Sequence, residues 1–253
     1  MRRAVIFDVD GVLVDSYDAH FRSWRDILRE NGLDMSEADF AQTFGRTSRE
    51  IIRRFWGDEV DDATARAIDD RKEALYRDLV RAAFPAMDGA VALIDALHGA
   101  GFALAVGSSA PPENVVLSLD GLGRRDAFRA IVTGRDVTRG KPDPQVFLLA
   151  AERLGMAPRD CVVIEDAPAG VRAAAAAGMA NVALLGTAPR EVLLEAGACL
   201  TVASLRELSA DALARLIDGT RRASPRRGFS VPAPRAAASA STNRRSQRAR
   251  RRR

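Results

Sequence analysis

The sequence predicts an α/β fold, in which a Rossmann-like parallel sheet core carries an α-helical cap domain inserted after the first strand. Two observations support this prediction. Short, continuous apolar runs alternate with amphipathic helical stretches along most of the chain, as is typical of a parallel sheet covered on both faces. Between about residues 17 and 84, by contrast, the pattern is helical throughout and contains no convincing strand.

The apolar runs predict five strands, at Ala4–Phe7, Phe102–Val106, Ala130–Val132, Cys161–Ile164 and Val182–Leu184. Helices are predicted between them at Val91–Leu97, Pro112–Leu119, Pro144–Leu154 and Ala169–Ala177. Prolines begin two of these helices, as a first helical turn tolerates. Inside the insertion the helices are expected at Ala19–Asn31, Ser36–Thr43, Ser48–Phe55 and Asp62–Arg81. We therefore expect a catalytic core of residues 1–16 and 85–220 and a cap of residues 17–84.

The composition is that of a soluble globular protein. A chain of 253 residues, with 47% hydrophobic and 28% charged residues, is long enough to bury a sizeable core. No apolar run approaches the roughly 18 residues that a membrane span needs, and Met1-Arg2-Arg3 leads directly into a strand pattern. We expect a cytoplasmic monomer with no membrane partner.

The chain has two cysteines, Cys161 and Cys199, far apart and without a His or Cys at metal-ligand spacing. Neither a disulfide framework nor a zinc site is therefore indicated. We interpret both as small hydrophobic residues of the core.

The positive net charge is concentrated at the C-terminus. The chain carries +4, but residues 221–253 hold twelve arginines and no acid, which leaves −8 on residues 1–220. This Arg-, Ala-, Ser- and Pro-rich tail has little apolar surface to bury, so we expect it to be disordered. It could bind nucleic acid or another anion weakly by counterion release. The simpler interpretation is a solvated extension, because repeated aromatic stacking residues are missing from it.

Polar side chains follow three of the predicted strands, at the edge where ligands bind in open α/β sheets. The side chains that follow the strands are Asp8, Asp10, Ser108, Ser109, Glu165 and Asp166. The turn Gly140–Pro144 adds one lysine, Lys141. The sequence therefore predicts an acidic pocket that contains one lysine and one or two hydroxyl groups.

Four carboxylates near one point repel one another and need a cation. Oxygen ligands without His or thiolate indicate a hard ion, most simply Mg²⁺, which commonly bridges to a substrate phosphate. In such a site one carboxylate can attack phosphorus to give an aspartyl-phosphate. A second acid, two residues further on, can protonate the leaving oxygen and later activate water. The lysine and a hydroxyl would balance and orient the phosphoryl oxygens.

Four short segments follow one another along the chain: Asp8-Val9-Asp10-Gly11-Val12, Ser108, Lys141-Pro142 and Glu165-Asp166. Their order and spacing resemble those of the four motifs of the haloacid dehalogenase superfamily, and the resemblance covers about residues 3 to 215. The insertion looks like the cap of the β-phosphoglucomutase-like branch of that superfamily. The resemblance implies that Asp8 is the nucleophile, that Asp10 is the general acid and base, and that Ser108 and Lys141 hold the phosphoryl group. It also implies that Mg²⁺ is organised by Asp8, the Asp10 carbonyl, Glu165 and Asp166.

The insertion also resembles that cap locally, in His20-Phe21-Arg22 with Trp24, in Gly45–Glu50, and in Arg71-Lys72 with Tyr76. The resemblance implies that His20, Arg49 and Lys72 serve cap closure and the substrate phosphate. A histidine or lysine on a helix equally suits a packed or solvated face, so that alternative stays open. Ser109 and Asn114 follow the second strand and are candidates for substrate contact.

These residues predict a Mg²⁺-dependent phosphatase of small phosphorylated metabolites such as sugar phosphates. The first alternative is a β-phosphoglucomutase-type isomerase, which returns the phosphoryl group to sugar instead of water. The second alternative is anion binding through the tail. The cap residues support the isomerase. The loop Ser109–Asn114, however, departs from the small-polar, Lys-bearing stretch typical of the mutases, so the phosphatase ranks first.

Overall fold

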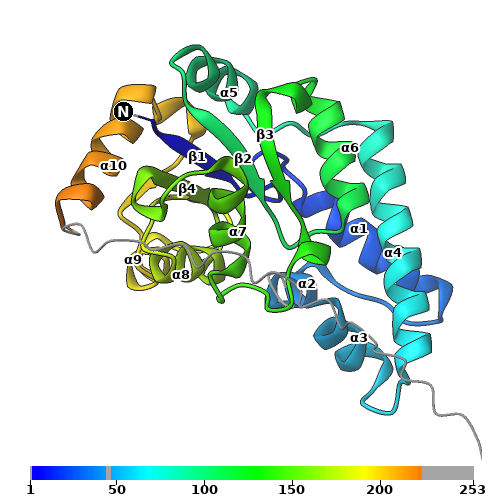
Figure 1. Cartoon of the computed structure of the whole chain (residues 1–253). Coiled ribbons are helices and arrows are strands. Elements are labelled where there is room, and N and C mark those ends of the chain that lie inside the picture. Colours follow the sequence, from blue (N-terminus) through cyan, green and yellow to red (C-terminus); the bar gives the residue numbers. More distant parts are fainter. Residues whose placement is uncertain (1, 44–46, 224–253) are drawn as a thin grey trace, which may run out of the picture.

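The computed structural model describes residues 2–43 and 47–223. It confirms the predicted α/β fold: within these residues six parallel strands form one sheet in the order β3-β2-β1-β4-β5-β6, with helices on both faces (Figure 1). The strands are β1 (Ala4–Phe7), β2 (Ala103–Gly107), β3 (Phe128–Val132), β4 (Cys161–Glu165), β5 (Ala180–Leu184) and β6 (Leu200–Val202). Strand β6 is not among the predicted strands; it has only three residues and contains a polar threonine.

The central strand β1 is buried on both faces, which explains its continuous apolar sequence. Val5 and Phe7 point into one apolar cluster, and Ala4 and Ile6 point into another on the opposite face. Helices α5 (Ala90–Gly99), α6 (Pro112–Leu122) and α10 (Ala210–Ala223) contribute to the first cluster. Helices α7 (Gln145–Leu154) and α8 (Pro168–Ala176) contribute to the second, and α9 (Arg190–Glu195) packs beside α8.

The segment between β1 and α5 is helical, as predicted, and we call it the helical insertion. Its helices are α1 (Tyr17–Glu30), α2 (Glu37–Thr43), α3 (Ser48–Trp56) and α4 (Asp62–Ala82). They enclose an apolar cluster of their own, which includes Trp24, Leu28, Phe40 and Ile52. Helix α4 packs against α1 and also against α6 of the sheet layer (Figure 1). The division of the chain into a core and a cap domain stays a prediction.

The chain enters and leaves the helical insertion at one place. The backbone N–H of Asp15 donates to the carbonyl of Pro85 over 2.8 Å, and Val14 forms an antiparallel bridge with Ala86. The two connecting segments are therefore tied together directly beside the end of β1.

The predicted start of the disordered tail is wrong by three residues, because Arg221–Ala223 form the end of α10. Arg221 pairs with Asp218 at 2.9 Å, three residues earlier on α10, and with Asp160 at 2.7 Å, a contact that no local sequence pattern reveals. The rest of the predicted tail, residues 224–253, lies outside the described residues. Cys161 is buried, but Cys199 is exposed, so its assignment to the core is also wrong. Within the described ranges, no helix has both the length and the apolar character to cross a membrane.

Candidate active site

The parallel register of β1, β2 and β4 brings their carboxyl ends to one edge of the sheet. Directly after β1, the N–H of Asp8 continues the ladder by donating to the Ile164 carbonyl at 3.0 Å. The N–H of Ser108, after β2, donates to the Val132 carbonyl at the same distance. Each polar side chain therefore leaves the backbone at a position that strand pairing defines.

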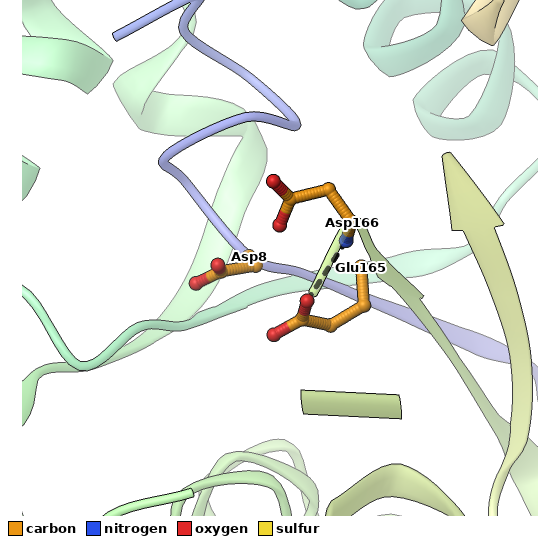
Figure 2. Close-up of side chains that lie close together, drawn as sticks. All are labelled: Asp8, Glu165 and Asp166. Carbon is orange, nitrogen blue, oxygen red and sulfur yellow. Dashed lines mark hydrogen bonds between the residues drawn. The ribbon is translucent and has the colours of Figure 1, made fainter. Parts of the chain in front are cut away.

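Three carboxylates from two neighbouring strands meet at this edge: Asp8, Glu165 and Asp166 each offer an oxygen within 4.8 Å of the others (Figure 2). Lys141 Nζ lies 2.9 Å from Asp8 Oδ1 and 2.7 Å from Glu165 Oε1. Glu165 Oε2 accepts the backbone N–H groups of Asp166 and Ala167, both over 2.8 Å. The lysine and these two amides fix the orientation of Glu165.

Burial shapes the electrostatics of this cluster. It raises the pKa of Asp8 to about 7; the Lys141 charge acts against this rise, and Glu165 and Asp10 add to it. Burial and the charges of Glu165 and Asp8 raise the pKa of Asp166 well above its usual range. One lysine therefore does not offset the repulsion among three buried acids.

This donor set fits a hard divalent cation. The ligand atoms are all carboxylate oxygens, they are close together, and they have excess negative charge. Mg²⁺ prefers such ligands. Asp8, Glu165 and Asp166 are the side chains that would hold it, and the side chain of Asp10 is not part of this group of three.

The carboxylate of Asp10 faces the helical insertion instead. Its Oδ1 accepts the Tyr76 hydroxyl at 3.2 Å and lies 3.4 Å from His20 Nε2. Burial raises the pKa of Asp10, but the hydrogen bond from His20 and the charge of Lys72 bring it down to about 2. Lys72 Nζ lies 2.9 Å from His20 Nδ1. Because an ammonium group can only donate, Nδ1 accepts and the Nε2–H of His20 faces Asp10.

The contact between α4 and α6 continues this chain of hydrogen bonds. Lys72 Nζ donates to Glu73 Oε1 at 2.7 Å, and Glu73 Oε2 accepts Asn114 Nδ2 at 2.6 Å. Arg77 Nη1 donates to Asn114 Oδ1 at 3.1 Å. Both polar atoms of the buried Asn114 side chain are thus bound by α4.

A cavity of about 630 Å³ lies between the helical insertion and the sheet edge. Ten of the eleven predicted site residues line it: Asp8, Asp10, His20, Lys72, Ser108, Ser109, Asn114, Lys141, Glu165 and Asp166. The eleventh, Arg49, lies outside this lining, on an exposed part of α3, where it pairs with Asp62 at 2.5 Å. Of the segment Gly45–Glu50, Gly45 and Arg46 lie outside the described residues.

Several polar residues that line the cavity are not among the predicted site residues, and three of them contact or adjoin the predicted ones: Asp69, Glu73 and Thr187. The Thr187 hydroxyl donates to Asp166 from the loop after β5, so the rule applied to the other strand ends would have found it. Asp69 and Glu73 share one face of α4 with Lys72, and this helical spacing is their only sequence signal.

The doubly wound parallel sheet, the buried acids at its carboxyl edge and the cavity above them define the protein as an α/β enzyme. The chain belongs to the haloacid dehalogenase-like hydrolases, whose family model matches residues 2–178.

Two relatives and one solved structure illustrate this membership. The chain is 37% identical to hexitol phosphatase A of Escherichia coli, over 70% of this chain and 80% of that protein. It is 34% identical to the β-phosphoglucomutase of Bacillus subtilis, again over 70% and 80%. The crystal structure of a haloacid dehalogenase-family hydrolase from Entamoeba histolytica superposes with a TM-score of 0.79 at 26% identity, covering 86% of this chain and all of that one.

Proposed function

We propose that the protein is a Mg²⁺-dependent phosphatase that hydrolyses monophosphate esters of small polyhydroxylated metabolites through an aspartyl-phosphate. The observation that carries this proposal is the position of Asp8. Its carboxylate lies on the floor of the cavity, 2.9 Å from Lys141 and beside the acids Glu165 and Asp166. The similarity to a hexitol phosphatase supports a sugar or polyol phosphate as the substrate.

In the first step Asp8 attacks phosphorus, and the bond between phosphorus and the ester oxygen breaks. The leaving oxygen takes a proton from Asp10, which has to bind that proton beforehand. Lys141 and Ser108 balance and orient the phosphoryl oxygens. Mg²⁺ bound to the acid cluster would supply charge neutralisation for the transferring group.

In the second step water attacks the phosphorus of the aspartyl-phosphate, and the bond to Asp8 breaks. Asp10 accepts the proton of the attacking water. The Nε2–H of His20 and the Tyr76 hydroxyl hold the Asp10 carboxylate at the cavity wall. Inorganic phosphate and the free metabolite are the products.

Substitution of the nucleophile tests this mechanism. We expect Asp8→Asn to lower phosphate release from a hexitol monophosphate by at least about a thousandfold, because the amide cannot form the intermediate. A malachite-green assay in Mg²⁺ measures the release, and circular dichroism checks folding. Asp18→Asn, on the exposed side of α1, is the matched control and should keep wild-type activity. Full activity of Asp8→Asn would contradict the aspartyl-phosphate mechanism, and full activity in EDTA would contradict the metal requirement.

A β-phosphoglucomutase-type isomerase is the second candidate, and the Bacillus subtilis relative favours it. With β-glucose 1-phosphate and a bisphosphate primer, an isomerase would yield glucose 6-phosphate. Release of free phosphate without that product rejects the isomerase. A cytoplasmic location and a monomeric state stay predictions.

A further inference from the structure

The helical insertion supplies one wall of the cavity, opposite the sheet edge that carries Asp8. Besides His20, Lys72, Glu73 and Ile51, this wall contains two aromatic rings, three hydroxyl groups and a further acid: Trp24, Phe40, Thr43, Thr47, Ser48 and Asp69. Asp69 precedes Tyr76 by seven residues on α4, so the two Cα atoms are about 10 Å apart along the helix axis. Since Tyr76 contacts Asp10, Asp69 lies about two helical turns further from the reacting groups along α4.

The carboxylate of Asp69 has an unsatisfied oxygen. Its Oδ1 is buried and has no hydrogen-bond partner among the described residues. Burial raises the pKa of this group, and the Ser48 hydroxyl and the Lys72 charge act against that rise. A buried acceptor without a partner costs free energy, and a donor on a bound ligand would remove that cost.

The cations of the lining are already engaged. Among the described lining residues the ammonium groups are those of Lys72 and Lys141. Lys72 is bound by Glu73 and His20, and Lys141 by Asp8 and Glu165. Six carboxylates line the same cavity: Asp8, Asp10, Asp69, Glu73, Glu165 and Asp166.

We infer that Asp69 is a specificity-determining residue that selects monophosphates whose far end carries hydroxyl or ammonium donors and disfavours a second phosphate. A hydroxyl or ammonium group donates to the free carboxylate oxygen, whereas a phosphate dianion meets a like charge there. This inference rests on the proposed phosphatase function and narrows its substrate class. It also argues against the isomerase as the function of this protein, because an isomerase of that type has to hold a sugar bisphosphate in the cavity.

The test compares two substrates that share one sugar, fructose 1-phosphate and fructose 1,6-bisphosphate. For wild type we expect kcat/KM to favour the monophosphate by at least about a hundredfold. Asp69→Asn removes the charge and keeps the shape, and should reduce this preference by about tenfold, in part through a higher kcat/KM for the bisphosphate. That gain cannot come from a misfolded variant. Asp70→Asn, its exposed neighbour on α4, is the control and should leave the preference unchanged.

The outcomes separate the inference from the function on which it rests. Equal kcat/KM values of wild type for the two substrates, or an unchanged preference in Asp69→Asn, overturn the role of Asp69 and leave the phosphatase standing. If wild type releases phosphate from neither sugar nor from p-nitrophenyl phosphate, the proposed function and this inference are both wrong.

Discussion

Gly170, in the first turn of α8, lies against the carboxylate of Glu165. A Cβ atom added at Gly170 would lie 1.6 Å from Glu165 Oε1, the oxygen that binds Lys141. Another glycine of the site, Gly11, combines a φ of 72° with a Cβ position 2.0 Å from Asp166 Oδ2. At both positions the acid cluster occupies the space that a side chain would need, so the geometry of the cluster depends on glycine.

At the residue scale we therefore expect Gly170→Ala to push Glu165 away from Lys141. A displacement of about 1 Å in such a site can lower kcat/KM by about a hundredfold, and phosphate-release kinetics measure this loss. The matched control is Gly219→Ala in α10, where nothing lies within 4 Å of the added Cβ. This control should keep its activity and gain about 0.5–1 kcal/mol of unfolding free energy. Unchanged kinetics of Gly170→Ala would show that Glu165 need not hold its observed position.

At the element scale, α4 connects the helical insertion to the sheet layer. One of its faces carries Asp69, Lys72 and Glu73 toward the cavity, and the same face contacts α6 through Asn114. Glu73 is buried, and burial raises its pKa, but Lys72 and Asn114 together hold the pKa below its usual value. The position of Lys72, and through it of His20, therefore depends on how α4 packs against α6.

We expect Asn114→Ala to lower the free energy of unfolding by about 2 kcal/mol, because Glu73 and Arg77 each lose a partner. Urea denaturation measures this change. We also expect a lower kcat for phosphate release, since Glu73 then holds Lys72 less firmly. Ser118→Ala is the control on the same helix; it removes only a bond to a helix carbonyl, and its effect should stay within about 0.5 kcal/mol. An Asn114→Ala variant as stable as wild type would contradict the importance of this contact.

At the scale of the whole molecule, helix α10 contacts the first residues of the chain. Arg221 donates to the backbone carbonyl of Arg2 at 2.7 Å, and Arg3 pairs with Asp218 at 2.8 Å. These contacts join α10 to the segment that leads into β1. The basic residues beyond α10 are considered separately, because anion binding through them is the second alternative function.

Two truncations separate the tail from the fold. A chain that ends after Ala223 keeps Arg221, so we expect wild-type stability and wild-type phosphate release, with weaker retention on heparin. A chain that ends after Thr220 also loses the Arg221 contacts and should be less stable by about 1–3 kcal/mol in urea denaturation. If the chain ending after Ala223 stayed folded but lost metabolite turnover, the tail would be the working part of the protein.

Prediction from sequence succeeded for the placement of the residues that follow the strands. The apolar runs located five of the six strands, and the residues directly after them meet at one edge. This worked because Asp8, Ser108 and Glu165 take their positions from the backbone of parallel strands in register. The short strand β6 and the end of α10 were missed, because tertiary contacts rather than a local apolar pattern stabilise them.

The sequence by itself determined the fold class, the grouping of acids with one lysine at the sheet edge, and the family of hydrolases. Local apolar patterns and the order of the motifs suffice for these, since a parallel sheet aligns the carboxyl ends of its strands. Only the tertiary structure decided that Arg49 lies outside the cavity lining and pairs with Asp62, that Asp69 lines the cavity, and that Asn114 binds α4. These placements depend on the rotation and packing of α3 and α4, which helical periodicity alone leaves free.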